Sequence, residues 1–118
     1  MDPENCASYQ EIIAGIQKKE LIVVDVRSPH EIEGSGKIEC DRWLNIPIAE
    51  VKNAFSMDDD SFKSKYGIAK PKKEDSDLIF NCGSGKRSGM AINDVKSLGY
   101  TKARHYPGGY GKWKQEPL

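Results

Sequence analysis

The sequence predicts an α/β domain with a mainly parallel central sheet flanked by helices on both faces. Residues 21–26 and 78–82 are short, apolar and without alternation, as expected of strands that are covered on both faces. Segments with helical spacing and helix caps alternate with these strands, which is the chain order of β-α-β units. The 118-residue length suits one core, so residues 1–118 are expected to form a single domain.

Two capping boxes predict the helices of the N-terminal part. Ser8 and Glu11 stand three residues apart before an apolar stretch with helical spacing. Ser28 and Glu31 repeat this spacing after the first strand, and Pro29 occupies the first helical position. A helix is therefore expected before the first strand and a second, short helix directly after it.

The rest of the chain continues the alternation. Polar segments separate the expected elements, and Gly99 follows a helical pattern as a stop signal. The further predicted elements are, in chain order, a short strand at 43–46 followed by a helix, a short helix within 58–68 behind an acidic cap, the strand at 78–82, a helix from near Ser88 and a last short strand at 103–106.

Composition excludes several classes of partner. The 18 basic and 18 acidic residues cancel, so no overall field attracts nucleic acid or an anionic membrane. No apolar run approaches the ~18 residues of a membrane span, and the acidic start lacks the layout of a secretory signal. The three cysteines, Cys6, Cys40 and Cys82, are odd in number and widely spaced, which fits free thiols in a reducing compartment better than a disulfide framework. A cytoplasmic, monomeric protein is expected.

The glycine-rich turn after the strand at 78–82 carries the strongest functional signal. It does not match the phosphate-binding pattern G-x-x-x-x-G-K-[ST], because the first glycine would fall on Phe80 and Arg87 follows Lys86 in place of a hydroxyl residue. Cys82, at the start of the turn, is then the residue to explain. A cysteine that ends an apolar strand is often only a small core residue.

The strand-turn-helix frame favours a reactive thiolate at Cys82. Backbone N–H groups of such a turn can converge on one point, and the following helix contributes its partial positive charge there. Gly83 and Gly85 allow positive φ and close approach of the backbone. Amide donors, the helix dipole and nearby cations lower a thiol pKa, and the thiolate is the nucleophile.

Other residue clusters give weaker signals. Asp25 and Arg27 stand at the end of the first strand, where open α/β sheets place ligands, but an ion pair is the preferred interpretation. His30 and His105 are isolated in the sequence, and no CxxC or HxxxH spacing occurs, so no metal site is predicted. Cys6 and Cys40 lie in no motif and are interpreted as incidental.

Three segments in the same order resemble the rhodanese-like family. They are "LIVVDVRSPHEIEGSGKI", with a strand that ends in Asp-Val-Arg, "CGSGKRS", which matches the active loop Cys-x-x-Gly-x-Arg-Ser/Thr, and "GGYGKW", similar to a C-terminal Gly-Gly-x-x-x-Trp. The resemblance spans nearly the whole chain. It departs at residues 36–41, where many members have Gly-His-Ile-Pro-Gly-Ala.

The resemblance implies a single rhodanese domain that acts as a thiosulfate sulfurtransferase. Cys82 would be catalytic and would accept a sulfane sulfur as a persulfide, with Lys86 and Arg87 neutralising a small anionic donor. A thiol such as glutathione or thioredoxin, or cyanide, would then remove the sulfur, without metal or organic cofactor. The implied substrate-binding residues are Gly83, Ser84, Gly85, Lys86, Arg87 and Ser88.

Two other functions stay open for the same fold. One is a cysteine-dependent phosphatase or arsenate reductase, and the other is a non-enzymatic sulfur carrier or interaction module. Cysteine phosphatases typically place five residues between Cys and Arg, whereas four separate Cys82 from Arg87 here. The shorter loop favours sulfur transfer over phosphate chemistry.

Overall fold

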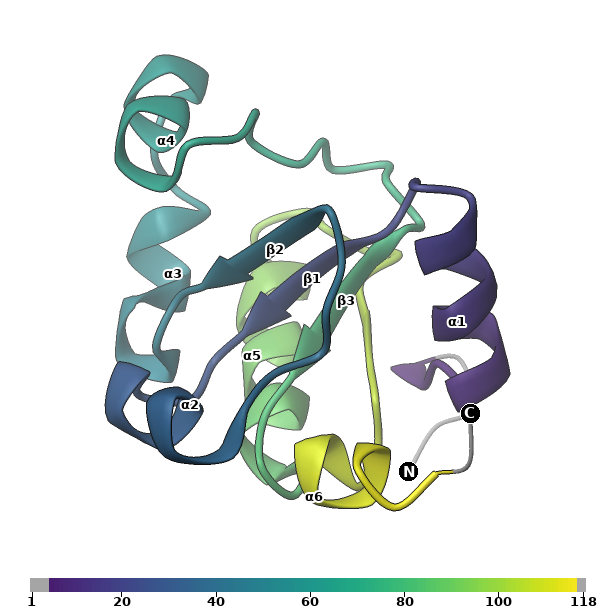
Figure 1. Cartoon of the computed structure of the whole chain (residues 1–118). Coiled ribbons are helices and arrows are strands. Elements are labelled where there is room, and N and C mark those ends of the chain that lie inside the picture. Colours follow the sequence, from purple (N-terminus) through teal and green to yellow (C-terminus); the bar gives the residue numbers. More distant parts are fainter. Residues whose placement is uncertain (1–4, 117–118) are drawn as a thin grey trace.

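A four-stranded parallel sheet forms the centre of the molecule (Figure 1). The computed structural model describes residues 5–116, and the strand order is β2-β1-β3-β4. The elements are α1 (Tyr9–Gln17), β1 (Ile22–Asp25), α2 (Pro29–Ser35), β2 (Arg42–Asn45), the 3-10 helix η2 (Ile48–Glu50), α3 (Val51–Ala54), α4 (Asp59–Tyr66), β3 (Leu78–Asn81), α5 (Lys86–Ser97), β4 (Arg104–His105) and α6 (Gly109–Trp113). The predicted α/β architecture is confirmed.

Hydrophobic clusters cover both faces of the sheet. Successive side chains of β3 point to opposite faces, so Leu78 and Phe80 join the larger cluster while Ile79 joins the smaller one. The larger cluster packs under α3, α4 and α5, and the smaller one under α1 and α6. Because β1 and β3 are buried along their whole length, these strands carry the apolar sequence typical of central parallel strands, except at their last residues, Asp25 and Asn81.

Both predicted capping boxes are present. The Ser8 side chain accepts from the Glu11 N–H and the Glu11 carboxylate accepts from the Ser8 N–H, which starts α1. Ser28 and Glu31 make the same reciprocal pair at the start of α2. Each box satisfies backbone donors that the first helical turn leaves without a partner.

The start of α5 and the presence of α6 differ most from the sequence prediction, while β3 and β4 are one or two residues shorter than the strands predicted at 78–82 and 103–106. Helix α5 begins at Lys86, two residues earlier than the expected start near Ser88, because Gly85 takes a left-handed conformation (φ 98°) that ends the turn at once. The segment after β4, for which no element was predicted, forms helix α6. The N-cap residue Gly108 and the first helical residue Gly109 both have positive φ, a conformation that the spacing of apolar residues does not predict.

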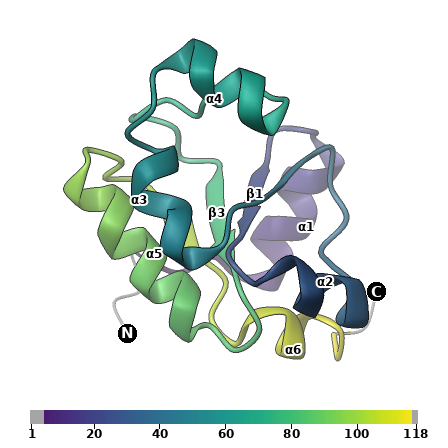
Figure 2. The same cartoon turned by 90° about the vertical axis from the view of Figure 1, so that its left-hand side faces the viewer.

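The carboxyl ends of the strands meet α2, α6 and the start of α5 at one edge of the sheet (Figure 2). This edge is where open α/β sheets bind ligands. The turn between β3 and α5, which contains Cys82, lies there. Within residues 5–116, no helix is long and apolar enough to cross a membrane.

Candidate functional site

Cys82 lies one residue beyond β3, at the base of the turn that leads into α5. The turn closes tightly because Gly85 takes φ 98° and stands against the backbone of Gly108. A Cβ atom at Gly85 would lie 2.8 Å from the Gly108 nitrogen, so any larger residue would force the two loops apart. The glycine therefore brings the start of α5 close to the Cys82 side chain.

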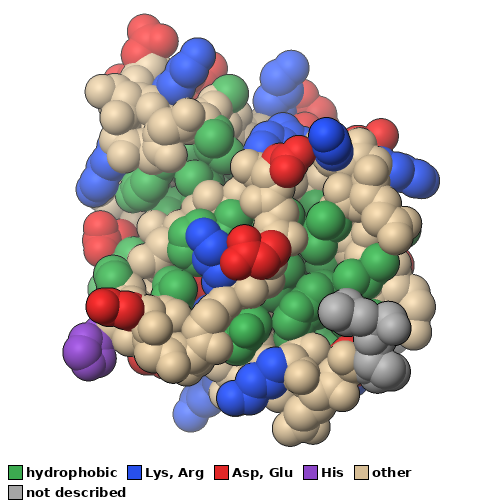
Figure 3. Space-filling model, in the orientation of Figure 1, with side chains coloured by type: hydrophobic (Ala, Val, Ile, Leu, Met, Phe, Trp, Pro, Cys, Tyr) green, Lys and Arg blue, Asp and Glu red, His purple; other side chains and the backbone are tan. Residues whose placement is uncertain are grey.

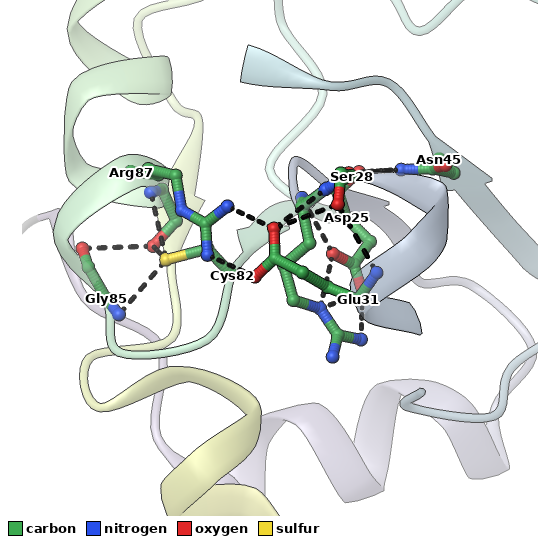
Figure 4. Close-up of polar contacts among 9 residues, drawn as sticks. Asp25, Ser28, Glu31, Asn45, Cys82, Gly85 and Arg87 are labelled. Carbon is green, nitrogen blue, oxygen red and sulfur yellow. Dashed lines mark hydrogen bonds and ion pairs between the residues drawn. The ribbon is translucent and has the colours of Figure 1, made fainter. Parts of the chain in front are cut away.

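The turn wraps its hydrogen-bond donors around the Cys82 sulfur (Figure 4). The Gly85 N–H donates to Sγ over an N···S distance of 3.0 Å, and the Ser88 N–H donates over 3.3 Å. The Ser88 hydroxyl oxygen lies 3.5 Å from Sγ. Cys82 and Ser88 are both fully buried, so these donors act on the sulfur with little competition from water.

These donors favour the thiolate form of Cys82. Burial alone would raise the pKa of the thiol, but hydrogen bonds from the Ser88 hydroxyl and from the N–H groups of Ser88, Ser84 and Gly85 together lower it. Cys40 shows the opposite balance, because burial raises the pKa of its thiol. The turn thus makes Cys82 the more acidic and more nucleophilic of these two thiols.

Glu31 of α2 holds the Arg87 side chain at the edge of the turn. Its two carboxylate oxygens accept from Nη1 and Nη2 of Arg87, at 2.7 and 2.8 Å. The hydrogen bond from Arg87 is the main cause that lowers the pKa of Glu31 to about 2. The stability that the ion pair contributes is therefore fully present above pH 4.5 and is lost as the pH falls through about 2. The pKa of Arg87 is raised, chiefly by its hydrogen bond to Glu31 and by the Glu31 charge, and to a lesser extent by the charge of Cys82.

A buried ion pair fixes the end of β1 beside the turn. Arg27 donates from Nη2 to Asp25 at 2.6 Å and to the Gly36 carbonyl at 2.8 Å. Its guanidinium also lies 4.8 Å from the centre of the Tyr110 ring. The ion pair predicted for Asp25 and Arg27 is confirmed, and it links β1, the end of α2 and α6 below the site.

Helix α6 anchors the turn through backbone hydrogen bonds. The Tyr110 N–H donates to the Cys82 carbonyl at 2.7 Å, and the Gly111 N–H donates to the Gly83 carbonyl at 3.0 Å. Gly109 allows this approach, since a Cβ atom there would lie only 2.3 Å from the Cys82 carbonyl oxygen. Gly109 and Gly111 thus help to fix the position of Cys82, although more than twenty residues separate them from it in the sequence.

The structure brings the predicted site residues together in different ways. Cys82, Gly85 and Ser88 form the buried centre of the turn. Ser84 and Lys86 are exposed on its outer side. Gly83 is half-buried and borders a pocket of about 250 Å³ that is also lined by Arg27, Glu31, Ser35, Tyr110, Gly111 and Lys114.

Sequence reasoning did not assign Glu31 or His105 to the site. Glu31 was recognised only as a helix cap, and His105 as an isolated residue, because their partners Arg87 and Ser88 are distant in the sequence. Among the described residues no group of three or more His, Cys, Asp or Glu side chains is arranged to hold a metal ion. The arrangement instead places a buried thiol within a ring of hydrogen-bond donors.

The sequence matches known proteins over almost its full length. Residues 8–116 match the family model described as a rhodanese-like domain. A mouse protein named thiosulfate sulfurtransferase/rhodanese-like domain-containing protein 3 is 40% identical over 106 residues, which cover 90% of this chain and 66% of that protein. The human thiosulfate:glutathione sulfurtransferase is 44% identical over 92 residues, which cover 78% of this chain and 77% of the human protein.

A solved structure shares the fold. The human single-domain sulfurtransferase TSTD1 superposes with a TM-score of 0.87 at 36% sequence identity. The match covers 97% of this chain and 98% of the human chain.

Proposed function

The chain belongs to the rhodanese-like domain family and is a sulfurtransferase of the rhodanese type, and we propose that Cys82 carries the transferred sulfur as a persulfide. The observation that carries this proposal is the convergence of the Gly85 and Ser88 N–H groups on Sγ, at 3.0 and 3.3 Å. Donors in this position stabilise a negative charge on the thiolate and on the terminal sulfur of a persulfide.

Two displacements complete the proposed reaction. The Cys82 thiolate attacks the sulfane sulfur of a thiosulfate-type donor, a new S–S bond forms, the donor S–S bond breaks, and sulfite leaves with the electron pair. A thiolate acceptor then attacks the outer sulfur of the persulfide, and the Cys82 thiolate leaves. The enzyme returns to its starting state, so the cycle consumes no oxidant or reductant.

Positive charge beside the turn suits an anionic donor. Lys86 is exposed at the first position of α5, and the Arg87 guanidinium lies near Cys82, whose charge contributes to the raised pKa of Arg87. Arg87 offers two parallel N–H donors, which match an oxyanion better than a point charge does. In this structure Glu31 accepts both of those hydrogen bonds, so Glu31 and the donor would compete for Arg87.

Opposite effects on thiosulfate use are expected for the two members of this ion pair. Replacing Arg87 by Ala should raise KM for thiosulfate by about tenfold or more, the loss expected for one charge-assisted hydrogen bond of roughly 1.5–3 kcal/mol. Replacing Glu31 by Gln should lower KM a few-fold, because the amide keeps the geometry but removes the competing charge. Steady-state kinetics with varied thiosulfate measures KM for both variants. Lys102→Ala is the control, because it removes an exposed cation near the opposite edge of the sheet and should leave KM and kcat unchanged. Equal KM values for Arg87→Ala and the parent protein would place the donor away from Arg87.

The acceptor is proposed to be a small thiol such as glutathione. Two relatives, from human and from Saccharomyces cerevisiae, are named thiosulfate:glutathione sulfurtransferases. In the pocket that borders Gly83, Lys114 supplies a cationic side chain in the same lining as Tyr110, whereas the Arg27 guanidinium is already paired with Asp25. The Lys114 ammonium suits one carboxylate group of a peptide. On the face seen in Figure 3, basic and acidic side chains are interspersed, without the continuous basic surface that nucleic acid requires.

A mass measurement tests the proposed function against phosphate chemistry. The reduced protein should gain the mass of one sulfur atom on treatment with thiosulfate, lose it to cyanide or glutathione, and show no useful hydrolysis of aryl phosphates. The physical reason is the size of the turn, since four residues between Cys82 and Arg87 form a ring suited to one extra sulfur atom rather than to a tetrahedral phosphoryl group. Phosphatase turnover that depends on Cys82, with no persulfide formed, would falsify the proposal.

A further inference from the structure

A buried serine-histidine pair lies behind the Cys82 sulfur, and its histidine, His105, has no part in the reaction described above. The Ser88 hydroxyl oxygen is 3.5 Å from Cys82 Sγ and 2.8 Å from Nδ1 of His105 on β4. It also lies 3.2 Å from the Gly85 carbonyl oxygen. Cys82, Ser88 and His105 are each fully buried, so the contacts among them form inside the protein.

The Ser88 hydroxyl has one hydrogen and three neighbours that could use it. If Nδ1 of His105 accepts, the hydroxyl hydrogen points to the imidazole, and the sulfur receives no hydrogen bond from the Ser88 hydroxyl, only the one from the Ser88 N–H. If Nδ1 carries the ring hydrogen and donates, the hydroxyl oxygen is satisfied as an acceptor and its hydrogen is available to the sulfur. The tautomer of His105 therefore decides which hydrogen bonds Cys82 receives.

The same tautomer satisfies both protonation states of Cys82. With a neutral thiol, Ser88 Oγ accepts from the S–H and from Nδ1–H and donates to the Gly85 carbonyl. With a thiolate, Oγ still accepts from Nδ1–H, and its hydrogen turns from Gly85 to the sulfur. Only the hydroxyl rotates, and His105 keeps its proton in both states. The opposite tautomer would leave the buried thiolate one donor short.

We propose that His105 is a positioning residue for the sulfur chemistry: its Nδ1–H donates to Ser88 Oγ, and Ser88 thereby directs its hydroxyl hydrogen to the Cys82 sulfur. The proposal rests on the proposed function where it takes Cys82 as the reacting group, but the hydrogen-bond relay itself can be measured without sulfur transfer. Burial lowers the pKa of His105, which keeps the imidazole neutral at neutral pH with one ring hydrogen to place.

The surroundings of His105 define the controls for a pH measurement. Three described titratable groups lie around His105. Cys82 is reached through Ser88, and Cys6 is paired with His105 in a parallel β-bridge. Lys86 of α5 lines, together with His105, a pocket of about 320 Å³. Cys6→Ser is therefore introduced into every variant, so that alkylation reports on Cys82 and no thiol in the bridge titrates. Cys40, whose pKa is raised by burial, is replaced by Ser for the same reason.

The alkylation rate of Cys82 against pH tests the relay in four variants, each compared with the parent protein. His105→Phe should raise the inflection by about one pKa unit, a tenfold loss of thiolate below the inflection, because Ser88 then loses the donor that orients it. His105→Asn should restore most of the acidity, since its amide N–H can take the place of Nδ1–H. Ser88→Ala should raise the inflection as well, and adding His105→Phe to Ser88→Ala should raise it no further.

Each alternative outcome contradicts the relay. A further rise in the Ser88→Ala/His105→Phe protein would show that His105 acts through packing or its own field rather than through Ser88. An unchanged inflection in His105→Phe would remove His105 from the site. If that variant does not fold, the nitrogen chemical shifts of His105 in the parent protein decide: Nδ1–H is expected, and the Nε2–H tautomer would overturn the proposal. Because none of these readouts requires turnover, failure of the relay and failure of persulfide formation remain distinguishable.

Discussion

Replacing Cys82 by Ser is expected to abolish sulfur transfer in a protein that stays folded. Serine is nearly isosteric with cysteine and keeps the hydrogen bonds of the turn, but its hydroxyl is far less acidic and cannot form a persulfide. The loss in kcat/KM should be at least about a thousandfold, as for other nucleophile deletions. Thiosulfate:cyanide kinetics measures the loss, and circular dichroism with urea unfolding measures the fold.

The other two cysteines supply matched controls. Cys6→Ser and Cys40→Ser make the same chemical change outside the turn, so both should retain near-normal turnover. Substantial turnover by folded Cys82→Ser would remove Cys82 as the sulfur carrier. Loss of turnover in folded Cys40→Ser would instead give that thiol a part in the reaction, against the raised pKa that its burial produces.

Gly109→Ala is expected to destabilise the domain and to disable the turn, although residue 109 contributes no side chain to the site. Gly109 has φ 61°, and a Cβ atom would lie 2.3 Å from the Cys82 carbonyl oxygen and 2.7 Å from the Gly83 carbonyl carbon. The left-handed backbone costs alanine roughly 1–2 kcal/mol, and the overlap should cost a further 1–3 kcal/mol. The free energy of unfolding should therefore fall by about 2–5 kcal/mol in urea titrations.

Activity should fall with it, because relieving the overlap separates α6 from the turn and breaks the hydrogen bonds to the Cys82 and Gly83 carbonyls. Gly34→Ala is the matched control, since Gly34 is exposed in α2 with open space around its Cβ position. Alanine there should leave the unfolding free energy unchanged or raise it by up to about 1 kcal/mol. Equal stabilities for the two variants would show that α6 does not restrain the turn.

Short sequence patterns predicted the elements that are determined by residues close together in the chain. The capping boxes at Ser8 and Ser28 need only residues three positions away, so both helix starts follow from the sequence. The apolar run of β3 and the glycines behind it placed Cys82 at a strand-turn-helix junction. Helix α6 was not predicted, because its two leading glycines take left-handed conformations that only packing against the turn explains.

By itself the sequence determined the α/β class, the position of Cys82 in its turn and the family resemblance, because these depend on residue types at short, fixed spacing. Only the tertiary structure decided which side chains act on that turn. Glu31 reaches Arg87 from α2, and His105 reaches Ser88 from β4, across sequence separations that no local pattern bridges. Parallel pairing of the strands carries these distant residues to one region, and the close packing there sets the distances on which the chemistry of the thiolate depends.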